Sequence, residues 1–115
     1  MTALLPDTPV TGYYRTKLVR GGVFVPVKLW WGAPIDPEDY SQTLDRSPRW
    51  QALVDGELFM GNVLDVWAFC AGRQISEAEY RFMVARASHA RTYDTGHPSA
   101  EPRRPVDFNR IPLVF

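Results

Sequence analysis

Two runs of β-branched and aromatic residues near the start of the chain are separated by a pair of glycines. The runs span residues 13–31, YYRTKLVRGGVFVPVKLWW, and flank Gly21 and Gly22. Glycine readily adopts the positive φ angles that a tight two-residue hairpin turn requires. The pattern therefore predicts a β-hairpin over residues 13–31.

A two-residue turn at these glycines would set the register of the predicted hairpin. Its core face would carry alternate apolar residues of the second run: Val23, Val25, Val27, Leu29 and Trp31. The opposite face would carry four cross-strand pairs: Tyr13 with Trp30, Arg15 with Lys28, Lys17 with Pro26, and Val19 with Phe24. Because Pro26 has no N–H to donate, we expect the second strand to be an edge, or to bulge, at that position.

The pattern changes after the first hairpin. Residues 32–49 contain three prolines and four acidic residues without a sustained period, which is typical of a loop. In residues 50–60, two short β-prone runs flank Asp55-Gly56, a strong signal for a tight hairpin turn. A second, shorter hairpin is therefore predicted over residues 50–60.

Helical spacing of apolar residues follows the second hairpin. Four of them lie at i, i+3, i+4 and i+7: Val63, Val66, Trp67 and Cys70. Asn62 can cap the start of this short helix and Gly72 can end it. One face of the short helix is thus expected to be buried.

The segment ISEAEY carries the clearest local signal in the chain. Ser76 as N-cap, with Glu79 three residues later, makes a capping box, and Glu77 can pair with Arg81 one turn further on. A helix is predicted over residues 77–93. Its expected apolar stripe consists of Tyr80, Met83, Val84, Ala87 and Ala90, widened by Phe82 and Ala85.

The two ends of the chain are predicted to be extended. Residues 1–12 form an N-terminal arm, and the four prolines of residues 97–115 exclude a long helix or a central strand. This tail is expected to dock on the domain through its large apolar residues: Val106, Phe108, Ile111, Leu113 and Phe115. Residues 1–115 are therefore predicted to be a single α+β domain, a small antiparallel sheet of hairpins with one longer and one short helix on one face.

Composition narrows the classes of function. A chain of 115 residues with 45% hydrophobic and 23% charged residues is typical of one globular domain and excludes a disordered or fibrous protein. Thirteen basic residues balance thirteen acidic ones, so no overall field attracts nucleic acid or an anionic membrane. The lone Cys70, the absence of a signal-peptide pattern and the lack of a long apolar run favour a cytoplasmic protein without a membrane span.

Residues that could support catalysis do not form a recognisable set. His89 and His97 have no carboxylate or thiol at metal-ligand spacing, and Cys70 lies on the apolar side of the short helix. Phosphate-binding, nucleophile-elbow and zinc-protease motifs are absent, and the acidic residues near position 38 are interpreted as a solvated loop. We therefore expect no enzyme activity, no cofactor and no metal site.

Charge is distributed unevenly in spite of the neutral total. Residues 8–35 carry four basic residues and no acidic one, whereas residues 36–45 carry four acidic residues and no basic one. The outer face of the first hairpin would combine rings and cations and is the candidate binding surface: Tyr13, Arg15, Lys17, Phe24, Lys28 and Trp30. Three interpretations stay open: the acidic loop or the tail covers this face, a protein partner binds it, or single-stranded nucleic acid binds it.

The strings GYYRTKLVRGGVFVPVKLWWG, LDRSPRWQALVDG, ISEAEYRFM and PRRPVDFNRIP together span most of the chain. In these strings the chain resembles a group of small uncharacterised proteins of bacterial phages and prophages, to which no activity is assigned. The resemblance implies an accessory protein in the host cytoplasm that binds a host or phage protein, with inhibitors of host defence such as anti-CRISPR proteins as examples of the class. It implies no catalytic or binding residue. The alternative function is a single-stranded nucleic-acid-binding protein that uses the same face.

Overall fold

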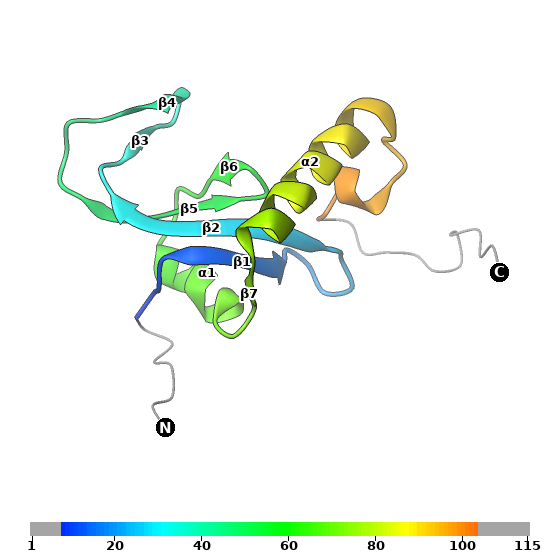
Figure 1. Cartoon of the computed structure of the whole chain (residues 1–115), viewed down its shortest axis with the longest axis horizontal. Coiled ribbons are helices and arrows are strands. Elements are labelled where there is room, and N and C mark those ends of the chain that lie inside the picture. Colours follow the sequence, from blue (N-terminus) through cyan, green and yellow to red (C-terminus); the bar gives the residue numbers. More distant parts are fainter. Residues whose placement is uncertain (1–7, 104–115) are drawn as a thin grey trace.

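A five-stranded antiparallel sheet forms the centre of the structure, a computed structural model that describes residues 8–103 (Figure 1). The strands lie in the order β6-β5-β2-β1-β7. Their bounds are Gly12–Lys17 for β1, Phe24–Gly32 for β2, Arg49–Val54 for β5, Glu57–Leu58 for β6 and Gln74–Ile75 for β7. With the two helices described next, the sheet confirms the predicted α+β class.

The two helices lie on opposite faces of the sheet. The short helix α1, Val63–Cys70, packs on one face, and the long helix α2, Glu77–Tyr93, crosses the other (Figure 1). The expectation that both helices share one face is wrong. A sheet has two faces, and here the second face is covered by the apolar side of α2.

The core lies between α1 and the sheet. Its buried residues alternate along the strands and follow the predicted helical spacing on α1: Tyr14, Val27, Leu29, Ala52, Val63, Val66, Trp67 and Cys70. The Tyr14 ring meets the Trp67 ring edge-on, with centroids 5.4 Å apart, and the Tyr14 hydroxyl donates to the Val10 carbonyl. The Asn62 side chain accepts from the Leu64 N–H and caps α1, as predicted.

The predicted core face of β2 is confirmed in its middle and wrong at its ends. Val25, Val27 and Leu29 are buried, whereas Val23 is only half-buried and lies outside the strand. Trp31 is 57% exposed, and its ring packs edge-on against Trp50 with centroids 5.7 Å apart. Alternation therefore identifies the face, but burial ends where α1 no longer covers the strand.

The register of the first hairpin differs from the prediction by two residues. Tyr13 lies opposite Lys28, Arg15 opposite Pro26 and Lys17 opposite Phe24. Six residues, 18–23, connect the strands in place of a two-residue turn, and the Gly22 N–H donates to the Val19 carbonyl within that loop. The predicted pairs Arg15 with Lys28 and Tyr13 with Trp30 are therefore wrong. A shift of two residues preserves the faces, so the paired residues of the two strands stay on the side that was predicted. Val19, which was predicted to pair with Phe24, lies in the loop instead.

Pro26 occupies a site where the sheet needs no donor. The Arg15 N–H points away from β2 and donates to the Arg73 carbonyl, so Pro26 faces Arg15 across a non-hydrogen-bonded pair. On its other side, pairing with β5 begins only at Val27, and the Pro26 carbonyl accepts from the Asp55 N–H. The prediction of an edge strand holds at this position alone, because β2 is otherwise central.

Helix α2 begins and ends as predicted. The Ser76 hydroxyl accepts from the Glu79 N–H at 3.1 Å, and Arg81 pairs with Glu77 at 2.7 Å. Three residues of the predicted stripe are buried against the sheet: Met83, Ala87 and Ala90. Phe82 and Ala85, which were expected to widen that stripe, are exposed.

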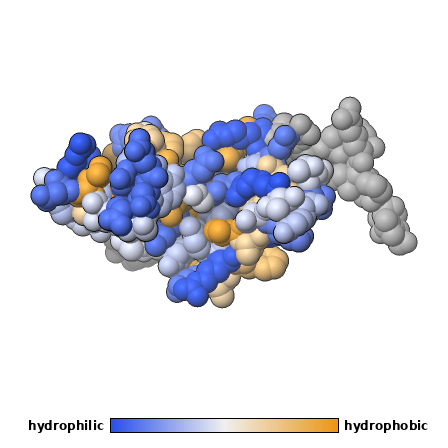
Figure 2. Space-filling view, turned by 90° about the horizontal axis from the view of Figure 1, so that it is seen from above, coloured by the Kyte–Doolittle hydropathy of each residue, from blue (hydrophilic) through white to orange (hydrophobic). Residues whose placement is uncertain are grey.

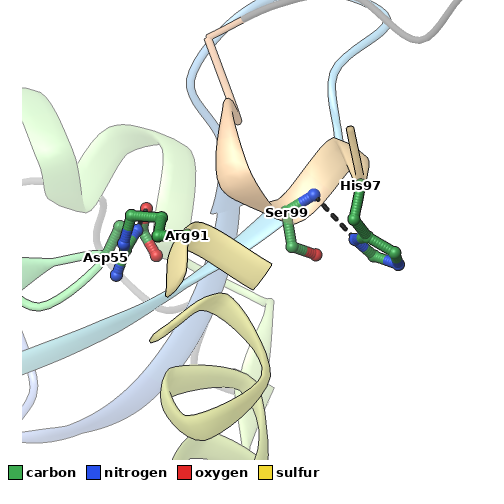
Figure 3. Close-up of polar contacts among 4 residues, drawn as sticks. All are labelled: Asp55, Arg91, His97 and Ser99. Carbon is green, nitrogen blue, oxygen red and sulfur yellow. Dashed lines mark hydrogen bonds and ion pairs between the residues drawn. The ribbon is translucent and has the colours of Figure 1, made fainter. Parts of the chain in front are cut away.

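The second hairpin and the end of α2 are joined by an ion pair. Asp55 and Gly56 both have positive φ angles, 54° and 84°, which confirms the tight turn predicted at this pair. Arg91 of α2 reaches Asp55 with an N–O distance of 3.0 Å (Figure 3). After α2, the His97 Nδ1 accepts from the Ser99 N–H at the start of the 3₁₀ helix Pro98–Ala100 (Figure 3).

Residues 32–49 contain a further short hairpin, which we call the acidic arm, rather than only a loop. Strands β3, Ile35–Asp36, and β4, Asp39–Thr43, pair with each other and project from one end of the sheet (Figure 1). Gln51 holds the base of this acidic arm: its amide donates to the carbonyls of Gly32 and Ala33 and accepts from the Ile35 N–H. All of β4 is exposed. Seen from above, the surface of the molecule is mostly hydrophilic, with small separate apolar patches (Figure 2).

The predicted end segments are described in part. Residues 1–7 of the N-terminal arm and residues 104–115 of the tail lie outside the described residues, as do the five apolar tail residues expected to dock. Within the described part, Pro9, Ser99 and Pro102 are buried. Gly22 lies so close to the Pro102 carbonyl that a Cβ at this position would be 2.9 Å from that oxygen.

Candidate binding surface

All six candidate residues lie on the face of the sheet that α2 crosses. Tyr13, Arg15 and Lys17 belong to β1, and Phe24, Lys28 and Trp30 to β2. Their strand neighbours Tyr14, Thr16, Val25, Val27 and Leu29 are buried on the α1 side. Because side chains alternate along a strand, the six candidates point away from the α1 side, opposite the core as predicted, and therefore toward α2.

Helix α2 covers part of this face and so reduces the number of candidate side chains that a partner could contact. The Tyr13 ring packs against Tyr80 of α2, with centroids 4.8 Å apart, so it is not open for a partner. Lys28 and Trp30 lie together, with the ammonium 5.4 Å from the ring centroid. The covers considered from the sequence were the acidic loop and the tail, and α2, which packs on this face through Tyr80, was missed.

Phe24 is surrounded by three cations. The Arg15 guanidinium lies 4.5 Å from the ring centroid, the Lys17 ammonium 5.0 Å and the Arg73 guanidinium 5.7 Å. Arg73 precedes β7, and its carbonyl accepts from the Arg15 N–H at 3.1 Å, which holds the two arginines on neighbouring strands. No sequence pattern pointed to Arg73, because β7 is only two residues long.

A groove of about 610 Å³ lies between this cluster and α2. The loop at Gly21 and Gly22 lines one side, and Phe82 and Arg86 of α2 line the other. Phe82 is 61% exposed, and the Arg86 guanidinium lies 5.4 Å from its ring centroid. The i, i+4 spacing of Phe82 and Arg86 is the signal that could have placed them together on one helix face.

We call this site the basic-aromatic groove and define it by six residues: Arg15, Lys17, Phe24, Phe82 and Arg86, which line it, and Arg73, which contacts the Phe24 ring from beside the groove. Within residues 8–103, none of its four cations forms an ion pair; the ion pairs found there join Arg81 to Glu77 and Arg91 to Asp55. One acidic residue, Glu79, also lines the groove. The groove is therefore positively charged and able to attract an anionic group.

The acidic arm does not neutralise this charge. Two of its carboxylates accept hydrogen bonds from residues of the arm itself. Asp36 accepts from the Glu38 N–H, and Asp39 accepts from the N–H and the hydroxyl of Ser41. The hydrogen bonds from Ser41 lower the pKa of the Asp39 carboxyl, which therefore keeps its charge. Of the predicted tail, Pro98 lines the groove, and residues 104–115 lie outside the described part.

The residues considered for catalysis occupy separate environments. Cys70 is fully buried, and burial raises the pKa of its thiol to about 11, so it is a neutral core residue at physiological pH. His89 is exposed on α2 beside Tyr93, and His97 accepts from the backbone. Among residues 8–103, no three histidine, cysteine or acidic side chains come together as they would around a metal ion.

Neither described helix combines the length and the apolar character that a membrane-spanning segment needs. Comparisons with protein-family models, with curated proteins and with solved structures found no match for this chain.

Proposed function

We propose that this chain is a non-enzymatic binding protein whose basic-aromatic groove captures an acidic segment of a partner protein. The observation that carries the proposal is the gathering of four cations around two aromatic rings, with no ion pair to any of them from residues 8–103. Arginine and aromatic side chains dominate the binding energy of many protein interfaces. The resemblance to small phage proteins supports a partner from the host or the phage, including a component of host defence.

The arrangement of the rings favours protein over single-stranded nucleic acid. Nucleic-acid platforms of this kind expose successive rings on which bases stack. Here the Tyr13 ring packs against Tyr80, and the half-buried Phe24 ring already contacts three cations. Phe82 is the open ring of the groove. Short acidic side chains can reach the four cations without such a row of rings.

The proposal is tested with two labelled probes, an Asp- and Glu-rich peptide containing phenylalanine and a thymidine oligonucleotide, at about 0.15 M salt. The groove variant is Arg15→Glu combined with Arg86→Glu. The matched control is Arg46→Glu combined with Arg49→Glu, which changes the charge equally at exposed positions beside the acidic arm. We expect the wild type and the control to bind the peptide, and the groove variant to lose binding by about tenfold or more, since an exposed ion pair contributes up to about 1 kcal/mol and two of them are lost.

Two results contradict the proposal. Equal binding of the peptide by the groove variant and the control would mean that the groove is not the site. Tighter binding of the oligonucleotide than of the peptide, with a steep dependence on salt, would favour the nucleic-acid alternative. Capture from extracts of the natural host, with the same pair of variants, would then identify the protein that depends on the groove.

A further inference from the structure

A second groove lies on the other face of the sheet, beside α1. Its volume is about 650 Å³, within the usual range for small-molecule sites, and it runs between α1, the loop after β1 and the β5–β6 hairpin. Apolar side chains make up most of its walls: Leu18, Val19, Val54, Phe59, Val66 and Phe69. Phe69 is 66% exposed although it belongs to the helix that packs on the core. We call this site the α1 groove.

Thr16 gives the α1 groove a polar group that lacks a hydrogen-bond partner. Thr16 is 5% exposed and lines the groove, and no hydrogen bond is made by its hydroxyl within residues 8–103. A buried hydroxyl without a partner is unfavourable, and native proteins seldom leave one so. An acceptor atom placed in the groove would satisfy the Thr16 hydroxyl.

Charged side chains at the groove are mostly basic. The basic residues that line it are Lys17, Arg20, Arg73 and Arg103, and the acidic residues are Glu57 and Asp65. The charged groups of Lys17 and Arg73 contact the Phe24 ring. Arg20 forms no ion pair within residues 8–103, so its guanidinium can pair with a ligand. Arg20 is adjacent to the apolar walls supplied by Leu18 and Val19. Its guanidinium fork suits the two oxygens of a carboxylate.

We propose that the α1 groove binds a small amphipathic carboxylate, an apolar chain or ring that carries a single anionic head, such as a medium-chain fatty acid. The apolar body would lie against Phe69 and its neighbours. The carboxylate would accept from the Thr16 hydroxyl and pair with Arg20. The α1 groove shares Lys17 and Arg73 with the basic-aromatic groove, but the head group proposed here uses Thr16 and Arg20, so its ligand does not depend on the function proposed above.

The test is displacement of the fluorescent anion anilinonaphthalene sulfonate from the full chain by decanoate, with decanol as the uncharged match. Two groove variants are compared, Phe69→Ser and Thr16→Val, with Phe82→Ser as control for loss of an exposed ring on the other face. We expect saturable displacement by decanoate, about tenfold weaker for both groove variants and unchanged for the control. Thr16→Val keeps the side-chain shape, so decanol affinity and the urea midpoint of the apo protein should not fall.

Three results would overturn the proposal. The first is no saturable displacement by decanoate. The second is equal loss of decanol and decanoate affinity in Thr16→Val, which would deny the hydroxyl a role in binding the head. The third is probe binding that occurs only after the apolar residues of 104–115 are replaced by serine, because the groove would then belong to a segment of the same chain.

Discussion

Removing the N-cap of α2 is the sharpest test of how the structure is stabilised around the binding groove. The Ser76 hydroxyl accepts from the Glu79 N–H at 3.1 Å, and it satisfies one of the four N–H groups that the first turn leaves open. Ser76→Ala deletes this acceptor and should cost about 1 kcal/mol. For a domain of this size, that loss corresponds to a fall in Tm of about 4 °C. Further along the same helix, Phe82 and Arg86 line the basic-aromatic groove.

The assay is urea denaturation followed by circular dichroism, with Ser88→Ala as the matched control. Ser88 is an exposed residue in the same helix, and its side chain caps nothing, so the better helix propensity of alanine should stabilise the control by a few tenths of a kcal/mol. The free energy of unfolding should therefore fall for Ser76→Ala and rise slightly for Ser88→Ala. A loss below about 0.2 kcal/mol at Ser76 would refute the capping argument.

Three further predictions concern single side chains. Cys70, with its pKa raised to about 11 by burial, should react with a thiol reagent at pH 8 only as fast as the protein unfolds; immediate stoichiometric reaction would contradict its burial. Burial raises the pKa of Asp55 although Arg91 opposes the shift, so the stability that this group contributes is present below its ordinary pKa of 3.8 and is lost as pH rises through its folded value. Asp55→Asn should abolish that part of the pH dependence in urea titrations, and an unchanged profile would disprove the assignment. Trp30→Ala should cost about 2 kcal/mol, because its half-buried ring removes roughly 100 Å² from water; a loss near zero would mean that the ring is free for a partner.

The helices could be predicted from the sequence because their signals are local. A capping box at Ser76 and an i, i+3, i+4, i+7 pattern ending at Cys70 depend only on neighbours within a few residues, and both helices begin where these signals place them. The Asp55-Gly56 turn is local in the same sense, since both residues adopt the positive φ angles that it requires.

The register of the first hairpin could not be predicted because it depends on contacts far along the chain. Gly21 and Gly22 suggest a short turn, but Leu18 and Val19 leave the strand to line the α1 groove, so the loop takes six residues. The faces survived this error because the shift is even. An odd shift would have exchanged core and surface.

The candidate surface was found only in part for a similar reason. Arg15, Lys17 and Phe24 are close in the hairpin and follow from strand alternation. Arg73 contacts Phe24, and Arg86 lines the same groove as Phe24, through packing between distant segments, which no local pattern reports. The cover by α2 was missed because its apolar stripe shows that the helix packs on the sheet but does not say on which face.

The most direct test of the central claim is an NMR titration of the full chain with the acidic peptide. The side-chain Nε–Hε signals of arginine report the arrival of a carboxylate at each guanidinium. We expect the signals of Arg15, Arg73 and Arg86 to shift together and saturate, whereas those of Arg46 and Arg49 should not move. Shifts confined to Arg46 and Arg49, or no saturable shift at Arg15 and Arg86, would contradict a binding site in the basic-aromatic groove.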